Sequence, residues 1–282
     1  MDTLSGMQIQ FSKMHGLGND FMVIDQISQD VRLSPELIAR LADRHTGVGF
    51  DQLLSVEPPT DPESDFRYRI YNADGSEAEQ CGNGARCFAK FVVDAGLSVK
   101  TELRLQTNSG VITTQLRDDG NVEVDMGVPT TVPDEIPFVT NEPGVTHRLA
   151  VGNQEVDVVA VSVGNPHAVV FVESVNDAPV ATLGPLLSRH ERFPRGANVG
   201  FCQVIDPGFA RLRVFERGVG ETRACGTGAC AAAVAGVLTG KFAERVKISL
   251  PGGKVKIKWE GAGRSLRMLG PACLVYEGRI DV

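Results

Sequence analysis

Hydrophobic and polar residues alternate along much of the chain, and this period of two predicts β-strands. The alternating segments are residues 122–128, 167–173, 211–216, 246–250, 254–259 and 273–280. Two other segments have the period of an α-helix, and each follows a cysteine. In residues 84–96 the apolar positions are Phe88, Phe91, Val92 and Ala95, the polar stripe is Arg86, Lys90 and Asp94, and Gly96 offers a stop. Residues 228–240 are apolar on every side, which is typical of a buried helix.

The chain contains an internal repeat. Its clearest part aligns, without a gap, RIYNADGSEAEQCGNGA (69–85) with RVFERGVGETRACGTGA (213–229), so that Arg69 pairs with Arg213, Tyr71 with Phe215 and Glu77 with Glu221. Three further blocks recur in the same order, at offsets of 143 to 151: GNDFMVI (18–24) with GNPHAVV (164–170), VGFDQLL (48–54) with VGFCQVI (199–205), and GNVEVDMG (120–127) with GRSLRMLG (263–270). Such self-similarity predicts a tandem duplication.

We therefore expect an α+β protein with two pseudo-symmetric domains, each a β-sheet or barrel wrapped around one central helix. The expected domains are residues 1–128 and 129–270. Residues 128–147 carry four prolines, which suits an extended connection between the halves.

Composition limits the class of partner. Of 282 residues, 42% are hydrophobic and 22% charged, the balance of a globular protein with a substantial core. A net charge of −7 without any basic run argues against nucleic acid or an anionic membrane as the main partner. The N-terminus lacks a secretory signal pattern, so we expect a cytoplasmic protein. The six cysteines include no Cys-x-x-Cys pair, and we expect no metal site.

Cys81 and Cys225 occupy equivalent positions, each at the N-terminal edge of a predicted central helix. Backbone N–H groups and the positive end of the helix dipole can there stabilise a thiolate or bind a carboxylate. The residue types alone leave open a second interpretation, in which both cysteines simply pack in tight turns. The remaining cysteines are expected to be structural: Cys87, Cys202, Cys230 and Cys273.

Taken together, the motifs resemble the diaminopimelate epimerase family, within the cofactor-independent amino-acid racemases and epimerases. The resemblance covers essentially the whole chain, through KMHGLGNDFMVID (13–25), RHTGVGFDQLL (44–54), NADGSEAEQCGNGARC (72–87), TNSG (107–110), VGNPHAVVF (163–171), RGANVGF (195–201) and ERGVGETRACGTGACAAAVA (216–235). The paired Cys-Gly-x-Gly motifs alone would indicate only the broader group.

The resemblance implies an isomerase that interconverts LL- and meso-diaminopimelate for lysine and peptidoglycan precursor synthesis, without pyridoxal phosphate or another cofactor. One of Cys81 and Cys225, as a thiolate, would remove the α-proton, and the other, as a thiol, would protonate the opposite face. The backbone N–H groups of Gly82, Asn83, Gly226 and Thr227 would stabilise the reacting carboxylate.

The resemblance also implies the substrate contacts and the assembly. The residues at family substrate positions are Asn19, Gln52, Asn72, Asn165, Asn198, Glu216 and Arg217. Arg217 suits a distal carboxylate, and His167 and Glu216 match positions that adjust the protonation of the cysteines. In the family the active site lies in a cleft between the domains, residues 271–282 pack back on the first domain, and the position of Tyr276 belongs to a homodimer contact.

Two other functions remain open at this point. One is a related cofactor-independent racemase with another substrate, such as a proline-type ring, for which a distal-carboxylate partner such as Arg217 is needless. The other is an amino-acid-binding protein without catalysis, whose cysteines only pack or form a redox-linked disulfide.

Overall fold

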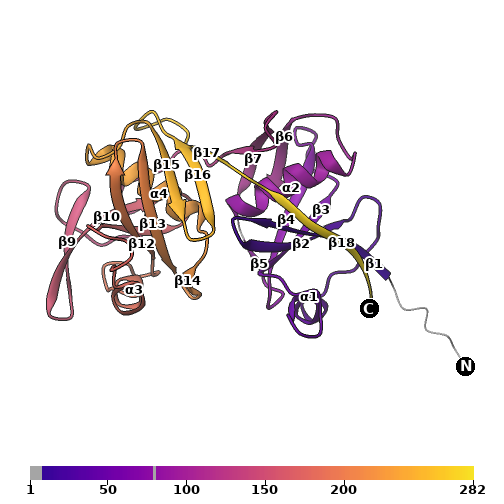
Figure 1. Cartoon of the computed structure of the whole chain (residues 1–282), viewed down its shortest axis with the longest axis horizontal. Coiled ribbons are helices and arrows are strands. Elements are labelled where there is room, and N and C mark those ends of the chain that lie inside the picture. Colours follow the sequence, from indigo (N-terminus) through magenta and orange to yellow (C-terminus); the bar gives the residue numbers. More distant parts are fainter. Residues whose placement is uncertain (1–7, 79–80) are drawn as a thin grey trace, which may run out of the picture. The chain divides into compact units, whose positions relative to one another are not determined.

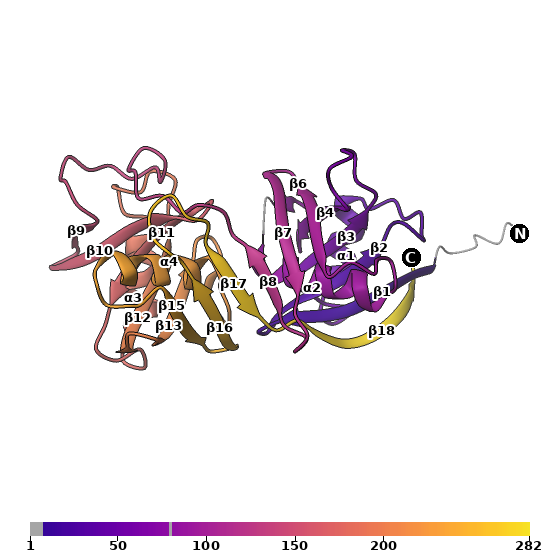
Figure 2. The ribbon, with the colours of Figure 1, turned by 90° about the horizontal axis from the view of Figure 1, so that it is seen from above.

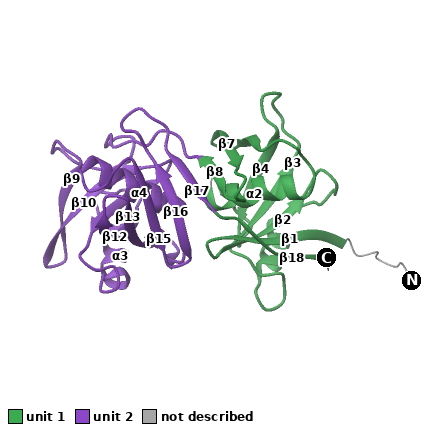
Figure 3. Cartoon of the chain, turned by 45° about the horizontal axis from the view of Figure 1, so that its top comes forward, with its two compact units in different colours: residues 1–124, 271–282 green, residues 125–270 purple. Residues whose placement is uncertain are grey.

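The chain divides into two compact units. The computed structural model describes residues 8–78 and 81–282, and Figures 1 and 2 show their helices and strands. Unit 1 runs to Val124 and takes in Pro271–Val282, and unit 2 is Asp125–Gly270 (Figure 3). The division between the units falls between Val124 and Asp125, and the sequence analysis had placed the boundary after residue 128.

Unit 1 is a single sheet with two helices. Its elements are β1 (Gln8–Gly16), β2 (Asn19–Asp25), α1 (Pro35–Ala42), β3 (Gln52–Glu57), β4 (Phe66–Asn72), β5 (Glu77–Ala78), α2 (Gly82–Asp94), β6 (Glu102–Thr107), β7 (Gly110–Leu116), β8 (Val122–Asp125), which ends at the boundary, and β18 (Cys273–Asp281). Pairing runs from β18 through β1, β2, β3, β4, β6 and β7 to β8, and β5 forms a short hairpin with β4. The pairs β2–β3 and β4–β6 are parallel and the others antiparallel.

Unit 2 repeats this arrangement. Its elements are β9 (Thr146–Val151), β10 (Gln154–Ser162), β11 (Pro166–Phe171), α3 (Val180–Ser188), β12 (Asn198–Asp206), β13 (Phe209–Glu216), β14 (Gly220–Thr222), α4 (Gly226–Leu238), β15 (Arg245–Leu250), β16 (Gly253–Lys258) and β17 (Arg267–Gly270). Pairing runs from β9 through β10, β11, β12, β13, β15 and β16 to β17, with β14 on β13. The pairs β11–β12 and β13–β15 are again parallel.

The outermost strand of the sheet is built differently in the two units. In unit 2 it is β9, which directly precedes β10 in the chain and pairs with it. In unit 1 the equivalent place beside β1 is taken by β18, the last strand of the chain. The pairing with β18 gives hydrogen-bond partners to N–H and C=O groups of β1 that would otherwise lie at the edge of the sheet.

Each parallel strand pair needs a long crossover, and each crossover carries one helix. The helices α1 and α3 lie between the strands of the first parallel pair, and α2 and α4 between those of the second. The sequence analysis missed α1 and α3. For α1 a signal was present, since Ser34 accepts a hydrogen bond from the Leu37 N–H at 3.2 Å and Pro35 opens the helix. Within the described part of the chain, no helix is long and apolar enough to cross a membrane.

The helices α2 and α4 form the centres of their units. Each contacts strands from most of its own sheet, while α1 and α3 belong to apolar clusters that include residues from several of the same strands. The prediction of a fully buried second helix is confirmed, because every residue from Gly228 to Gly236 is buried. The expected fold, an α+β protein with each sheet wrapped around a central helix, is the observed one.

The polar stripe predicted on α2 is wrong at Arg86, whose side chain is fully buried. Its Nη2 donates to Asn83 Oδ1 at 2.8 Å and its Nε donates to the Pro271 carbonyl at 3.2 Å. These oxygens satisfy the guanidinium away from water, which permits an arginine to be buried. The polar side of the helix is therefore enclosed at Arg86, while Lys90 and Asp94 of the same stripe keep contact with solvent.

Strand register corrects one block of the repeat alignment. Phe21 pairs with Gln52 between β2 and β3, and His167 pairs with Asn198 between β11 and β12. Since Phe21 and His167 are equivalent, Gln52 corresponds to Asn198, and the offset there is 146 residues instead of the 151 of the sequence alignment. A shift by an odd number of residues would turn each side chain to the other face of the sheet. The similarity between residues 48–54 and 199–205 is therefore not a structural equivalence.

The proline-rich segment after residue 128 packs onto unit 2. Ile136 and Phe138 lie in its core with exposed fractions of 0% and 3%, and Thr130 forms a β-bridge with Ser162. The connection predicted from the prolines is therefore partly buried in the second half.

We predict that Gly236→Ala destabilises the protein. In an unobstructed helix the change would gain about 1 kcal/mol, but a Cβ at position 236 would overlap the ring of Phe242. Overpacking of this kind costs about 1–3 kcal/mol, so the free energy of unfolding should fall in denaturant titration. A smaller loss in combination with Phe242→Leu would assign the effect to that overlap, and a more stable Gly236→Ala protein would contradict the prediction.

Candidate functional site

Cys81 is the N-cap of α2. Its Sγ accepts a hydrogen bond from the Gly84 N–H at 3.4 Å, and its own thiol points to Asn19 Oδ1 at 3.6 Å. An N-cap side chain satisfies one of the first N–H groups of a helix, which have no acceptor within the helix. The turn of the chain into α2 therefore fixes the position of the sulfur.

A β-hairpin places Asn19 beside this cysteine. The two turn residues between β1 and β2, Leu17 and Gly18, both have positive φ, of 58° and 86°, as the tightest hairpins require. Asn19 follows the turn directly, and its Oδ1 also accepts from Asn83 Nδ2 at 3.3 Å. The structure thus brings together four of the predicted residues: Asn19, Cys81, Gly82 and Asn83.

The other two predicted substrate residues of unit 1 face each other on neighbouring strands. Gln52 Nε2 donates to Asn72 Oδ1 at 3.1 Å, and Asn72 Nδ2 donates to Ser76 Oγ at 3.1 Å. Both side chains are half-buried amides without charge. They can recognise polar groups of a ligand by hydrogen bonds alone.

Cys225 is the N-cap of α4, at the position equivalent to Cys81. Its thiol donates to Glu216 Oε2 at 3.3 Å and lies 3.6 Å from Thr227 Oγ1. The residue is 4% exposed, and burial raises the pKa of the thiol well above its usual value, with the Glu216 carboxylate adding to the rise. The thiol form is therefore favoured at neutral pH.

Glu216 is held in place by its own strand pair. It lies at the end of β13, and its second carboxylate oxygen accepts a hydrogen bond from Thr222 Oγ1 on β14. Its equivalent in unit 1 is Asn72, by both the repeat alignment and the strand register. At this pair of equivalent positions, the acidic side chain therefore occurs only in unit 2.

His167 orients Asn165 in unit 2. The histidine is 1% exposed, and burial lowers its pKa to about 3, with the charge of Arg217 acting in the same direction. The neutral ring donates from Nε2 to Asn165 Oδ1 at 2.9 Å, which turns the amide nitrogen of Asn165 toward Thr227 Oγ1 at 3.4 Å. His167 therefore acts here as a neutral hydrogen-bond donor.

Arg217 lines a cavity of unit 2. The cavity measures about 560 Å³, and Arg189 and Arg195 also line it. The backbone N–H of Arg217 donates to Asn198 Oδ1 at 2.9 Å, and its Nη1 donates to the Arg195 carbonyl at 2.6 Å. Three arginines among the lining residues of one cavity favour a ligand with a negative charge.

The hairpin that leads to each cysteine is closed by an equivalent ion pair. Arg69 binds Glu77 with two hydrogen bonds of 2.8 and 2.9 Å, and Arg213 binds Glu221 with two of 2.6 and 2.8 Å. The repeat alignment had paired these residues, and the structure gives them the same contact.

Tyr276 lies on β18, where its ring makes a T-shaped contact with the ring of Phe11.

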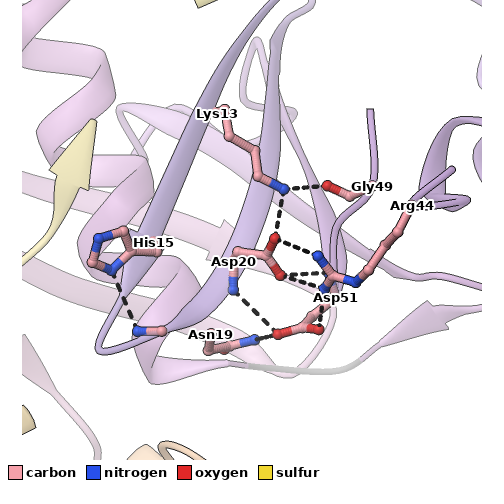
Figure 4. A network of polar contacts seen from close by, with 8 residues as sticks. Lys13, His15, Asn19, Asp20, Arg44, Gly49 and Asp51 are labelled. Carbon is pink, nitrogen blue, oxygen red and sulfur yellow. Dashed lines mark hydrogen bonds and ion pairs between the residues drawn. The ribbon is translucent and has the colours of Figure 1, made fainter. Parts of the chain in front are cut away.

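The sequence analysis missed a charged network beside Asn19 (Figure 4). Asp51 accepts from Asn19 Nδ2 at 3.0 Å, Arg44 bridges Asp51 and Asp20, and Lys13 binds Asp20 at 2.6 Å. Burial opposes ionisation of Asp20, but hydrogen bonds from Arg44 and Lys13 outweigh it and hold its pKa well below the usual range. These residues lie within the quoted motifs 13–25 and 44–54, but no residue type among them signals its role alone.

In the part of the chain that the structure describes, no group of three or more His, Cys, Asp or Glu side chains could hold a metal ion. The chemistry available at both helix starts is that of a thiol, backbone N–H donors and amide side chains. Such groups can exchange a proton and bind a carboxylate.

Comparison with solved structures gives the fold. A hydroxyproline epimerase from Agrobacterium vitis matches with a TM-score of 0.73 at 18% identity, covering 98% of this chain and 93% of that one. A PhzF-family phenazine biosynthesis protein from Bacillus anthracis matches with a TM-score of 0.72 at 16% identity, covering 98% and 100%.

Comparison of sequences gives the family. The diaminopimelate epimerase family model matches residues 11–132 and 159–275. Diaminopimelate epimerases from Pseudomonas paraeruginosa and Stutzerimonas stutzeri are 57% and 56% identical over 274 residues, covering 97% of this chain and 99% of each relative. The chain belongs to the diaminopimelate epimerase family.

Proposed function

We propose that this protein is a diaminopimelate epimerase, which inverts one α-carbon of diaminopimelate between the LL and meso forms. It acts in the cytoplasm on this small molecule and uses its own cysteines as the acid and base. The observation that carries the proposal is the equivalence of Cys81 and Cys225, each the N-cap of the central helix of its unit. The 57% identity to enzymes of that name supports the substrate.

The reaction is a proton transfer with two bases. A Cys81 thiolate takes the α-proton, so that an S–H bond forms as the C–H bond breaks and the electron pair stays on the α-carbon and its carboxylate. The Cys225 thiol gives its proton to the opposite face of that carbon and becomes the thiolate. The reverse reaction exchanges the two roles, and two bases are needed because one base would return the proton to the face it came from.

The assignment of Cys225 as the proton donor in this direction rests on its surroundings. Burial and the Glu216 carboxylate both favour the thiol form. When the substrate reacts, the developing negative charge lies close to this thiol and favours transfer of its proton. The neutral His167 supports the same assignment, since it adds no positive charge that would stabilise a resting thiolate.

The helix N-termini stabilise the charge that develops on the substrate. The N–H groups of Gly82 and Asn83 in α2, and of Gly226 and Thr227 in α4, belong to the first turns of their helices. Donors that are already oriented favour the transition state, in which the α-carboxylate gains charge, over the ground state.

The residues around the cysteines select the rest of the substrate. Arg217, on the arginine-lined cavity of unit 2, suits the distal carboxylate. Glu216 suits an ammonium group, and the amides of Asn19, Gln52, Asn72, Asn165 and Asn198 suit polar groups without adding charge. A monocarboxylic substrate such as proline would leave Arg217 without a partner.

The proposed assembly is a homodimer that includes Tyr276. Three consecutive apolar side chains of β18 are exposed, namely Leu274 at 47%, Val275 at 56% and Tyr276 at 45%. Exposed apolar groups in a row favour burial against a partner.

The activity is tested by following deuterium from solvent into the α-position of LL- and of meso-diaminopimelate. We expect deuterium in the product of each direction, and no exchange with proline. Cys81→Ala and Cys225→Ala should each lower epimerisation by at least about 100-fold, because each removes one proton-transfer group. Cys273→Ala, in β18, serves as the control and should stay active. Full activity of either site variant would rule out the two-base reaction.

Replacing Glu216 should make Cys225 more acidic. The variant Glu216→Gln exchanges the carboxylate for a neutral amide, which removes one of the two causes that raise the pKa of this thiol. Burial remains, so the pKa should fall without reaching that of an exposed thiol. The measurement is the pH dependence of Cys225 alkylation in a Cys81→Ala background, since the thiolate is the reactive form. Glu221→Gln, on the same hairpin, is the matched control, and an unchanged or higher midpoint in Glu216→Gln would contradict the prediction.

Tyr276→Asp should weaken the dimer. A buried carboxylate at the contact would cost more than an exposed one, so light scattering should show a shift toward monomer on dilution. As a control, Val99→Asp changes an apolar residue of unit 1 that is 97% exposed and lies outside β18, and it should leave the dimer intact. A wild-type protein that is monomeric at all concentrations would refute the assembly.

A further inference from the structure

We infer that Asp51 is a positioning residue for Cys81, acting through the side-chain amide of Asn19. The inference rests on the proposed function only in taking Cys81 as a proton-transfer group. Its geometry lies within unit 1, and Figure 4 shows the part around Asn19, Asp51 and Arg44.

The amide of Asn19 has a donating end and an accepting end, and the two face different partners. Nδ2 donates to Asp51 Oδ2 at 3.0 Å. Oδ1 accepts from Asn83 Nδ2 at 3.3 Å and from the Cys81 thiol at 3.6 Å. Because a carboxylate can only accept, Asp51 fixes the NH₂ end on its own side and leaves the carbonyl oxygen toward the sulfur. The reversed amide would set oxygen against oxygen at Asp51.

Asp51 is itself held from several directions. Arg44 Nη2 donates to Asp51 Oδ1 at 2.8 Å and also to Asp20 Oδ1 at 2.8 Å. The backbone N–H of Asp20 donates to Asp51 Oδ2 at 3.2 Å, and that of Asp51 returns a hydrogen bond to Asp20 Oδ1 at 3.0 Å. Lys13 adds a further contact to Asp20 at 2.6 Å. The network therefore joins the start of β2 to the start of β3 at the point where Asn19 lies.

The orientation of the amide affects the protonation of Cys81. A carbonyl oxygen accepts a hydrogen bond from a thiol and stabilises the S–H form, whereas an N–H group would donate to a thiolate and stabilise the S⁻ form. By fixing the carbonyl end toward the sulfur, Asp51 makes the Cys81 thiol a weaker acid than the reversed amide would. Among the described residues of unit 1, the charged or titratable groups near Cys81 include Lys13, Asp20, Arg44 and Asp51 of the network, His15 on β1, Tyr68 on β4, and Arg86 and Cys87 on α2.

Unit 2 orients its equivalent asparagine in another way. The carbonyl oxygen of Asn165 is engaged by His167 Nε2 at 2.9 Å, and the amide nitrogen faces Thr227 at the start of α4. The residue of unit 1 that corresponds to His167 is Phe21, which has no hydrogen-bonding group in its side chain. Asn19 thus turns its carbonyl oxygen to the start of α2, whereas Asn165 turns its amide nitrogen to the start of α4. Of these two asparagines, Asn19 is the one oriented by a carboxylate.

The test measures the alkylation of Cys81 by iodoacetamide in the full chain carrying Cys225→Ala, from about pH 6 to about pH 10, by peptide mass spectrometry. Asp51→Ala removes the acceptor for Asn19 Nδ2, so the amide can turn its NH₂ to the sulfur. We expect a lower midpoint and a neutral-pH rate about threefold to tenfold higher.

A second variant, Asp51→Asn, keeps the shape of the side chain. Arg44 and the Asp20 backbone N–H can both only donate and face opposite ends of the side chain, so in either orientation the NH₂ of the introduced amide meets a donor, and a neutral amide oxygen holds Asn19 Nδ2 less strongly than a carboxylate does. Two NH₂ groups cannot bond to each other, so where the introduced NH₂ faces Asn19, that amide should turn its carbonyl away from the sulfur and give up its hydrogen bond from Asn83 Nδ2 at 3.3 Å. This isosteric variant should therefore shift the midpoint in the same direction.

Two controls separate orientation from simple loss of charge. Asp65→Ala removes another carboxylate of unit 1, which binds Lys100 at 2.6 Å, and should leave Cys81 unchanged. A salt concentration of about 0.5 M screens charges at a distance, so the shift in the Asp51 variants should persist there.

The inference is overturned if both Asp51 variants, folded by circular dichroism, alkylate like the parent or at a higher midpoint, or if the shift disappears in salt. Alkylation needs no turnover, so this outcome leaves the proposed epimerase activity untouched. If the unmodified protein showed no epimerase activity, that result would overturn only the proposed function.

Discussion

The site depends on one constraint, the start of a helix that lies inside a sheet. The first N–H groups of a helix have no acceptor within the helix, and a helix enclosed by strands cannot leave all of them to water. In α2 the sulfur of Cys81 accepts one of these groups, and in α4 Cys225 has the same N-cap position. These N–H groups need hydrogen-bond acceptors, and a thiolate or a carboxylate is an anionic acceptor. The backbone at both helix starts therefore favours the binding of these anions.

Duplication produced two such helix starts, and their surroundings have since diverged. The scaffold is shared, including the order of strand pairs and the ion pairs Arg69–Glu77 and Arg213–Glu221. The groups that contact the sulfur differ, with a neutral amide at Cys81 and a carboxylate at Cys225. Burial and the Glu216 carboxylate raise the pKa of the Cys225 thiol, which suits the proposed role of Cys225 as the proton donor.

Much of this could be predicted from the chain. Period and repeat predicted the two central helices and their sheets, because amphipathic patterns and alignments are local properties of the sequence. The helices α1 and α3 were missed, although Ser34 and Pro35 form a recognisable start for α1. Arg86 was placed on a polar face, since a charged residue at helical spacing normally faces solvent. Its burial is accounted for by Asn83 in the same helix and by the carbonyl of Pro271, far along the chain.

The sequence by itself determined the duplication, the positions of both cysteines at helix starts and the family. The tertiary structure alone decided which residues correspond between the two copies and which ones surround each sulfur. Gln52 matches Asn198 because parallel strands set that register, although a more similar stretch of sequence lies five residues away. Asp51 meets Asn19 because β2 and β3 lie side by side, and the crossover between them brings Arg44 to both carboxylates. Contacts of this kind join residues distant in the chain, so no local pattern records them.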